Sequence, residues 1–515
     1  MKRVLHIIII LSIIQSITYS QDFQKIYISQ TDEIFNDIIL TQDGSYLIIG
    51  TKINETTDSS LVIMKLKQNG DTIWRKNYIF ENGFNPSSII QLDNGSFLLT
   101  GSELRNIQNK GHSRVEIILD PNGEIISNLA HPDQRRGDQI QHIYTSDNSY
   151  VFISNTGYPT GVQGIQFMKR KFNFDKMWNR IWERKNTDLG KKVFELENGS
   201  YLILGETYSL GVRKDILLLK FTQKGQLQWA KALGKDQNES LNSAWLNADG
   251  SIVIVGSTNS FSGNVLREEI LTTKIDTSGN IIWSKTYSSS GTSKGKSIHK
   301  IGANYHLLAE HNDLAGNNSN MIYLQIDEEG KLIESSYFSI ETICNMKLLQ
   351  SFNGEILIGC TKNIESKLFI CLIKTTEFNN CNSSWSLTEK DVQLNTIVDP
   401  SSDYSSIFGG SEEVLTSSKN SEIVSIGNTC LVAENNHTSF NNIQIFPNPV
   451  NKIINITGLT VPAFVEVYDI NGKLLISTIQ EWQDSTINVE HLVNGFYIIK
   501  IHNSKNYSAY KIFKM

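Results

Sequence analysis

The side chains of this sequence that could do chemistry are its histidines, the basic residues of its expected loops, and its paired acidic residues. The histidines cluster once, at His299, His306 and His311. Positions 306 and 311 are an odd number of residues apart, so on one strand their side chains would face opposite sides of a sheet. A joint metal site is therefore not expected, and no metal ligands are assigned.

A second candidate is a basic group. Arg105, His112 and Arg114 fall in a segment expected to be a long loop, residues 103 to 114, and Arg135 and Arg136 fall in the link at 131 to 138. Guanidinium groups recognise carboxylates and sulfates well. These five residues are the candidate ligand-binding set, and the alternative is that they are solvated loop charges.

No catalytic set emerges from the remaining side chains. Glu268 and Glu269 are adjacent and point apart if extended, whereas glycoside hydrolysis needs two carboxyls facing across a cleft. The chain shows no P-loop, no EF-hand calcium loop and no G-x-S-x-G elbow. No catalytic residue and no cofactor are assigned, and the sequence favours a non-enzymatic protein.

All five cysteines lie late in the chain, at Cys344, Cys360, Cys371, Cys381 and Cys430. An odd number leaves at least one thiol unpaired. Cys360 with Cys371, and Cys381 with Cys430, are two candidate disulfides that stay open. Zinc is not expected, because no C-x-x-C pair occurs.

An internal repeat must position these residues. The clearest copy runs from Asp249 to Tyr287, and its opening turn recurs every 49 to 55 residues. The turns are rich in Asn-Gly and Asp-Gly, which favour two-residue hairpins. They fall at Asp43-Gly44, Asn94-Gly95, Asn148-Ser149, Asn198-Gly199, Asp249-Gly250, Asn304-Tyr305 and Asn353-Gly354.

An apolar strand follows each turn and closes on a small residue, which lets neighbouring backbones approach closely. The closing residues are Gly50, Gly101, Ser154, Gly205, Gly256, Ala309 and Gly359. Seven copies at this period predict an all-β fold, a seven-bladed β-propeller over residues 21–385. Residues 23 to 30 align with the end of a blade, so they are expected to complete the last blade and close the ring. The long connections would all lie on one face, the default binding site.

Trp74, Trp229 and Trp283 each follow the glycine of a second turn by four residues, and Trp178 takes the equivalent place. A large aromatic at this position is expected to pack between neighbouring blades. The same Gly-x-x-x-Trp spacing resembles the Trp-docking repeats of quinoprotein dehydrogenases, which would imply pyrroloquinoline quinone. No cofactor-binding constellation accompanies it, so the packing role is favoured.

The two ends of the chain concern export. Lys2 and Arg3 precede the apolar run Val4 to Ile14 and a small-residue end at Ser20, which indicates a secretory signal peptide over residues 1–20. The net charge is −6, or −8 without those residues. A mildly acidic chain argues against a nucleic-acid partner. Residues 386–440 are rich in Ser and Asn and are expected to form mainly a linker, and strand-like patches such as Glu422 to Ile426 leave a small ordered element as the alternative.

The tail, residues 441–515, alternates apolar strands with Asn-Gly turns and is expected to form a small antiparallel β-sandwich. Its motifs resemble, in order, the type A C-terminal sorting domain of the type IX secretion system of Bacteroidota. The residues that carry the resemblance are Pro447, Asn448, Pro449, Asp469, Gly472, Gly495, Tyr497 and Lys511.

That resemblance implies where the protein is exported, and it does not imply an activity. The chain would cross the inner membrane, fold, and be recognised through its tail by the outer-membrane translocon, then be released or attached to surface lipopolysaccharide. The leading hypothesis is a secreted or cell-surface binding module for an unknown glycan or protein. The alternative is a carbohydrate-active or quinone-dependent enzyme with its site on the long-loop face.

Overall fold

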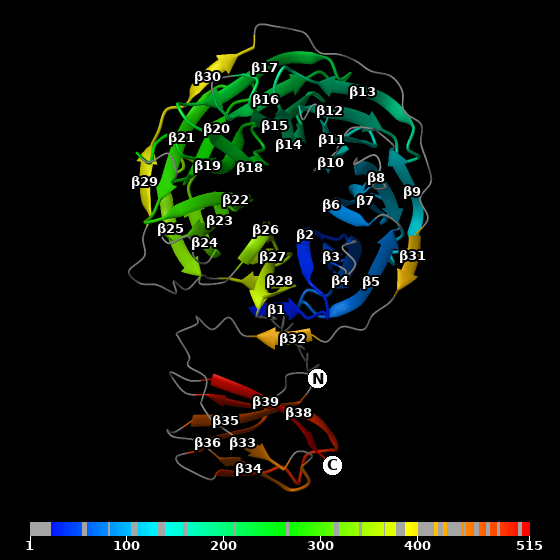
Figure 1. The fold of residues 1–515 in the computed structure, drawn as a ribbon, viewed down its shortest axis with the longest axis vertical. Coiled ribbons are helices and arrows are strands. Elements are labelled where there is room, and N and C mark those ends of the chain that lie inside the picture. The colour runs from blue at the N-terminus through cyan, green and yellow to red at the C-terminus, as the bar shows by residue number, and fades with distance from the viewer. Residues whose placement is uncertain are drawn as a thin grey trace, which may run out of the picture.

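The protein consists of a ring of β-sheets followed by a small β-domain (Figure 1). The computed structural model describes residues 22–53, 59–80, 83–104, 112–131, 140–157, 162–210, 213–263, 267–313, 319–338, 342–364, 366–376, 387–399, 417–420, 426–429, 444–447, 450–457, 463–469, 474–480, 485–502 and 507–514. Every regular element in these ranges is a β-strand. Among them, no helix is long and apolar enough to cross a membrane.

Seven four-stranded antiparallel blades form the ring. Within each blade, the first strand is the one nearest the ring axis and the fourth is the outermost. Blades 1 to 3 comprise β2 (Glu33–Leu40), β3 (Tyr46–Ile53), β4 (Ser59–Leu66), β5 (Thr72–Phe80); β6 (Phe84–Gln91), β7 (Phe97–Leu104), β8 (His112–Leu119), β9 (Ile125–His131); β10 (Ile140–Thr145), β11 (Ser149–Gly157), β12 (Gln163–Arg170) and β13 (Lys176–Trp182). Blades 4 to 6 comprise β14 (Asp188–Glu195), β15 (Tyr201–Thr207), β16 (Asp215–Phe221), β17 (Leu227–Gly234); β18 (Glu239–Leu246), β19 (Ile252–Thr258), β20 (Glu269–Ile275), β21 (Ile281–Ser288); β22 (Thr292–Ile301), β23 (Asn304–Asn312), β24 (Ser319–Ile326) and β25 (Leu332–Phe338).

Blade 7 combines the two ends of the ring. It contains β26 (Thr342–Gln350), β27 (Ile356–Ile364), β28 (Lys367–Thr375) and, as its fourth strand, β1 (Phe23–Tyr27). β1 pairs antiparallel with β28, with Ile26 opposite Cys371. The predicted closure by the N-terminal segment and the seven-bladed ring are therefore confirmed. Closure satisfies backbone groups that would otherwise form an open sheet edge.

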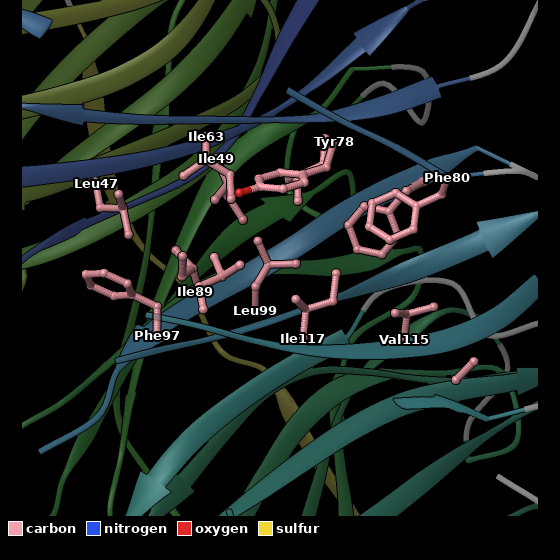
Figure 2. Close-up of a cluster of buried hydrophobic side chains, with 14 residues drawn as sticks. Leu47, Ile49, Ile63, Tyr78, Phe80, Ile89, Phe97, Leu99, Val115 and Ile117 are labelled. Atoms are coloured by element: carbon pink, nitrogen blue, oxygen red, sulfur yellow. The ribbon is translucent and has the colours of Figure 1, made fainter. Parts of the chain in front are cut away.

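The second strand of each blade has a mainly apolar, buried centre because both of its faces are covered. In β3, Leu47 and Ile49 pack toward blade 2, whereas Tyr46 and Ile48 pack toward blade 7. Figure 2 shows the first of these interfaces, with side chains of blade 1 facing those of blade 2. Alternating side chains thus join every blade to two neighbours.

In six of the seven blades, the small residue that closes the second strand faces a β-bulge in the described part of the first strand. A Cβ at Gly205 would lie 2.0 Å from the Leu189 carbonyl oxygen, so only glycine fits there. The turn of blade 7 corrects one alignment. Its Ser351 N–H donates to the Glu355 carbonyl as Thr41 does to Ser45 in blade 1, which places Cys360, not Gly359, at the position of Gly50.

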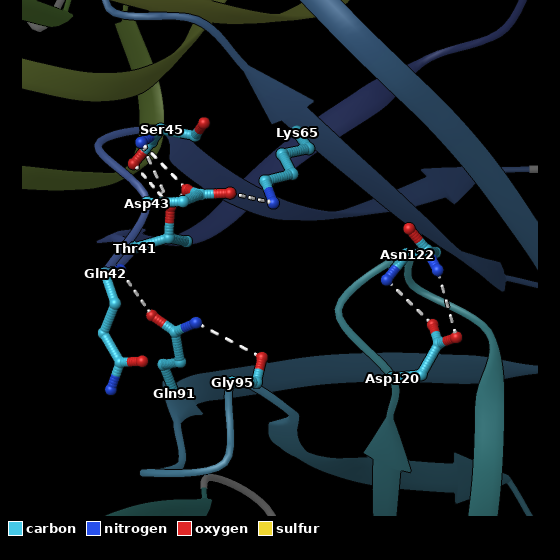
Figure 3. Close-up of polar contacts among 9 residues, drawn as sticks. All are labelled: Thr41, Gln42, Asp43, Ser45, Lys65, Gln91, Gly95, Asp120 and Asn122. Carbon is cyan, nitrogen blue, oxygen red and sulfur yellow. Dashed lines mark hydrogen bonds and ion pairs between the residues drawn. The ribbon is translucent and has the colours of Figure 1, made fainter.

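The tight turns between first and second strands lie on the face of the ring opposite the long connections. Their own side chains stabilise these turns (Figure 3). The Asp43 carboxylate accepts hydrogen bonds from the Thr41 hydroxyl at 2.6 Å and the Ser45 N–H at 3.2 Å, and it pairs with Lys65 at 2.5 Å. The backbone N–H of Gln42 donates to Gln91 of blade 2 at 2.7 Å. Turn chemistry therefore also links neighbouring blades.

An aromatic ring on the outer strand of one blade rests on the glycine of a turn in the next. A Cβ at Gly123 would lie 2.5 Å from the Trp74 ring, and one at Gly279 would lie 2.8 Å from Trp229. Trp178 covers Gly225, and Trp283 covers Gly330. The predicted packing role of the tryptophans is therefore confirmed. Phe23 of β1 covers Gly70 in the same way.

Polar groups reinforce this contact two and four residues after the aromatic. The Tyr78 hydroxyl donates to the Gly123 carbonyl at 2.5 Å, and Tyr27 donates to Gly70 at 2.8 Å. Lys231 and Arg180 reach turn carbonyls of the next blade at 2.7 Å and 2.9 Å. The recurring pattern of aromatic, cation and tyrosine on the fourth strand is thus an inter-blade clamp.

Residues 387–429, which fall in the expected linker, add a fifth outer strand to four blades. We call this segment the outer belt. β29 (Thr388–Asp391) pairs with β21, β30 (Asn395–Val398) with β17, β31 (Ser417–Asn420) with β5 and β32 (Ile426–Thr429) with β1. The described part of the expected linker thus contains ordered strands, the alternative left open by the sequence, because the outer strands of the blades offer unpaired edges that a polar segment can pair with.

The C-terminal domain confirms the predicted sandwich. One sheet contains β33 (Gln444–Phe446), β34 (Ile453–Thr457) and β37 (Ser485–Asn488). The other contains β36 (Leu474–Gln480), β35 (Ala463–Asp469), β38 (Gly495–His502) and β39 (Tyr507–Lys514). Between them lies an apolar core that includes Ile454, Val465, Val467, Ile499 and Ile512.

Cys360 and Cys371 are direct cross-strand partners in β27 and β28. Both are fully buried and carry free thiols. The predicted neighbourhood is therefore confirmed, without the disulfide. The Cys381 and Cys430 pair lies outside the described residues.

Replacing Gly123 by alanine tests the inter-blade contact. Gly123 and Gly302 both have positive φ, but nothing lies within 4 Å of a Cβ at Gly302. We expect Gly302→Ala to cost about 1–2 kcal/mol from the backbone alone. Gly123→Ala should cost about 1–3 kcal/mol more, because the rigid Trp74 ring must shift. Equal losses in denaturant unfolding would contradict the contact.

Candidate functional site at the ring axis and the long-connection face

Acidic side chains at the start of the first strands organise the long-connection face, from which the links between second and third strands leave. Asp188 accepts hydrogen bonds from the Trp182 indole at 3.0 Å and the Thr207 hydroxyl at 2.5 Å. Glu239 accepts from Thr258 at 2.7 Å and Ser260 at 2.6 Å. These carboxylates hold the end of the second strand against the first and so fix where the connection begins.

Asp215, the first residue of β16, is a buried acid with a different environment. Its side chain is 2% exposed, and in the described residues its Oδ1 has no hydrogen-bond partner. A Cβ at Gly234 would lie 2.0 Å from that oxygen, so glycine leaves room for the carboxyl group. Burial, and then the negative charge of Glu239, raise the pKa of Asp215 to about 7. A group this deeply buried acts on the fold rather than on a substrate.

The predicted basic group is only partly described, and the loop assignment of two members is corrected. Arg114 does not lie in a loop; it lies in β8 and is 6% exposed. Its guanidinium donates to Ser154 at 3.0 Å and to Gln166, and lies 4.7 Å from the Phe152 ring centroid. It therefore joins blades 2 and 3.

The other four members of that group are placed as follows. β8 begins at His112, which corrects its loop assignment as well, but the side chain of His112 is outside the described residues. Arg105, Arg135 and Arg136 also fall outside them. Loop assignment failed at residues 112 and 114 because a polar strand end buried between blades has the composition of a loop.

The three clustered histidines have separate partners. His299 and His306 are opposite each other in β22 and β23, but His306 bonds to the Tyr323 hydroxyl at 2.7 Å and His299 packs on Trp245. Burial lowers the pKa of both to about 4. His311 lies 2.9 Å from the Ser293 hydroxyl. In the described ranges, no group of three His, Cys, Asp or Glu side chains is arranged to hold a metal.

Charged residues gather instead where the seven first strands surround the ring axis (Figure 1). We call Asp37, Lys192 and Lys347 the axial cluster; they lie on β2, β14 and β26. Lys347 pairs with Asp37 at 2.5 Å. The charge of Lys347 also acts on His142 of β10 and His299 of β22, so its influence reaches four other blades.

Lys192 has the most perturbed charge of this cluster. Its side chain is partly exposed. Burial of the ammonium by the surrounding strands, and then the positive charges of Lys347 and Lys191, lower the pKa of Lys192 to about 8, while Asp37 opposes the shift. A perturbed pKa of this kind is frequent at functional sites.

Sequence reasoning missed the axial cluster, although a signal exists. Asp37, Ser88, Lys192, Ser243 and Lys347 each precede the first residue of their Asp-Gly or Asn-Gly turn by six positions. Aligning the first strands would have shown one polar column. Its members differ in charge between blades, and only the closed ring brings them to a common axis.

Four of the five sorting-signal residues that the structure describes lie on one sheet. Asp469 of β35 is the register partner of Tyr497 in β38, and Gly495 is the partner of Lys514. Lys511 lies in β39, the next strand. The Tyr497 ring is buried in the sandwich core, and its hydroxyl donates to the Val493 carbonyl at 2.6 Å. Pro447 is exposed, whereas Asn448, Pro449 and Gly472 lie outside the described residues.

Residues 444–515 match the family model of the secretion system C-terminal sorting domain. The protein is a type IX secretion cargo. The predicted recognition by that secretion system and the export of the cargo to the cell surface or the medium are therefore confirmed.

The cargo has structural similarity to several solved proteins at low sequence identity. A polysaccharide lyase, ulvan lyase bound to an oligosaccharide, has a TM-score of 0.42 at 10% identity over 69% of this chain and 96% of its own. Semaphorin 1b of Drosophila, extracellular domains 1–2, scores 0.43 at 9% identity over 69% and 87%. A protein of unknown function from Dyadobacter fermentans scores 0.42 at 10% identity over 68% and 97%. No curated protein is significantly similar in sequence.

Asp215→Asn should make the cargo more stable at pH 8. The folded state binds the Asp215 proton more tightly than the unfolded state does, so this stabilisation is complete below pH 3.8 and is lost as the pH rises through 7. A shift of this size corresponds to up to about 4 kcal/mol at pH 8. Denaturant unfolding at pH 4 and pH 8 measures the difference.

Asp43→Asn is the control of opposite sign. Burial works against the charged form of Asp43, but hydrogen bonds from Lys65 and Thr41 outweigh it and lower the pKa to about 2. Asp43→Asn should therefore destabilise at pH 8, and the loss should shrink in acid. A gain from Asp215→Asn that is the same at both pH values would contradict the assignment.

Lys192 should acetylate faster than the other lysines at neutral pH. With a pKa of about 8, a far larger fraction of its amine is neutral than for an ordinary lysine, by roughly two orders of magnitude at pH 7. Brief treatment with acetic anhydride, followed by peptide mass spectrometry, gives the rate at each site. Lys224, which is exposed, is the reference. Equal rates for Lys192 and Lys224 between pH 6 and pH 9 would contradict the lowered pKa.

Proposed function

We propose that the cargo is a non-enzymatic binding module that acts at the cell surface or in the medium. The observation that carries this proposal is the fixed origin of the long connections. Each leaves the same face of the ring, and carboxylates such as Asp188 and Glu239 tie its first residues to the blade. A rigid scaffold that displays variable connections on one face suits recognition of a glycan or a protein.

Contacts between blades support the rigidity that such a module requires. The side chain of Asn155 accepts a hydrogen bond from the Gly190 N–H of the next blade at 2.7 Å, and Glu206 accepts from Leu241 at 3.1 Å. Thr361 accepts from Phe35 at 2.9 Å across the ring closure. A preorganised face loses little conformational entropy on binding.

The ligand contacts remain those expected from the sequence. Arg105, Arg135 and Arg136, with His112, would contact an anionic group, while Arg114 would support them from within β8. An acidic glycan fits this set, because guanidinium groups bind carboxylate and sulfate. Surface lipopolysaccharide is the further partner that the sorting tail implies.

Thermal unfolding of residues 21–515 against a panel of ligands tests the proposal. Acidic polysaccharide, neutral polysaccharide and lipopolysaccharide are compared, and a ligand of the folded state raises the midpoint by mass action. We expect acidic polysaccharide to raise it, and Arg135→Ala with Arg136→Ala to reduce the rise. The exposed Lys224→Ala is the matched control. Cleavage of the polysaccharide into shorter chains would overturn the non-enzymatic assignment.

A further inference from the structure

One position of the first strand serves as a hydrogen-bond acceptor toward the next blade. Asp37 accepts from the Ile89 N–H at 3.1 Å, Gln141 from Val193 at 3.0 Å, and Ser297 from Leu348 at 3.0 Å. The side chain at this position thus replaces water for a backbone donor next to the ring axis. Its structural task is to accept a hydrogen bond.

Lysine occupies this same position in blades 4 and 7, as Lys192 and Lys347, and an ammonium group cannot accept. Lys347 is neutralised by Asp37 of blade 1 at 2.5 Å. Beside Lys192, Lys191 lies 3.6 Å from the Glu206 carboxylate. Among the described residues, no carboxylate forms an ion pair with Lys192, and its surroundings act on it only through burial and through charge.

Each cation near Lys192 thus has a carboxylate partner, and among the described residues Lys192 is the member of this group without one. The charged groups that act on it are Lys191 on its own strand, Lys347 of blade 7 and Asp37 of blade 1, with Asp37 already paired to Lys347. The lowered pKa of Lys192 agrees with this geometry, since burial of the ammonium is not offset by an ion-pair partner in the described residues. A bound anion would stabilise the Lys192 ammonium, since an opposite charge favours the charged form.

Phe194 lies two residues beyond Lys192 on β14, so both side chains emerge on the same face of the strand. The Phe194 ring is partly exposed and packs at its base against the interface of blades 4 and 5. A cation beside a partly exposed aromatic ring suits a small acid that has an apolar face.

We propose that Lys192 is the binding site for a single carboxylate or sulfate group at the ring axis, carried either by a free oxyanion or by an acidic sugar. The anion would complete the ion pair that the fold leaves open, with Lys347 adding long-range attraction. This site is formed by the first strands and does not depend on the long-connection face.

Protection of Lys192 from acetylation tests the site in the wild-type cargo. The probes are sodium sulfate, sodium galacturonate and neutral galactose, with the acetylation of Lys224 as the internal reference. Sulfate and galacturonate should slow acetylation of Lys192 at least tenfold at saturation, and galactose should not. Equal protection identifies the oxyanion as the whole ligand, whereas tighter binding of galacturonate identifies an acidic sugar.

Isothermal titration calorimetry with the same probes compares a variant of Lys192 with a matched control variant. Lys192→Met keeps the aliphatic stem and should weaken oxyanion binding tenfold or more, whereas Lys224→Met should leave it unchanged. Circular dichroism and the unfolding midpoint check that the variants are folded. No protection of Lys192 by either anion, or equal protection by galactose, would overturn the proposal. Because none of these measurements uses the arginines of the long-connection face, their failure leaves the binding-module test intact.

Discussion

The ring depends on one contact repeated around it, an aromatic side chain on the outer strand of a blade packed on the glycine of a turn in the next blade. The turn glycine needs positive φ and must also leave room for the ring, as Gly123 does for Trp74. The cation and the tyrosine that follow bind the carbonyls of the same turn. In the described residues, five of the seven junctions between blades are held in register by this short sequence pattern. The N-terminal β1 carries that pattern as Phe23, Lys25 and Tyr27, which lets the chain close the ring with the contact used elsewhere.

The outer belt follows from what the ring leaves unsatisfied. Four-stranded blades end on an outer edge of free backbone groups, and such edges invite pairing with other chains. β29 to β32 pair with four of these edges. Glu389 and Asp391 form ion pairs with Lys285 at 2.5 Å and 3.2 Å, and Val392 and Leu394 are buried against blades 4 and 5. β32 also covers β1, so the closing strand is paired on both sides. The segment that connects the ring to the sorting domain therefore stabilises ring closure.

The axis illustrates how one structural position can acquire different chemistry. The same place on the first strand bears acceptors in blades 1, 3 and 6 and lysines in blades 4 and 7. Pseudo-symmetry makes these side chains converge, while sequence divergence between the copies leaves them unequal in charge. A ring with identical blades would place like charges together at the axis. The pairing of Lys347 with Asp37 relieves that repulsion and leaves Lys192 as the exception.

Elements with local causes could be predicted from the amino-acid sequence. Asn-Gly and Asp-Gly turns, apolar second strands and the Trp pattern predicted seven blades, the N-terminal closure and the tryptophan contacts, and the ordered motifs of the tail predicted its sorting domain. Which polar residues are buried or brought together depends on long-range packing and could not be predicted in this way. Arg114 was expected in a loop because the segment that leads up to it is polar, yet the neighbouring blade buries its side chain. The outer belt was expected to be mainly a linker, because its short polar strands form only by pairing with the blade edges. The axial cluster joins residues about 150 and 310 positions apart, and ring closure, a long-range event, is what places Asp37 beside Lys347.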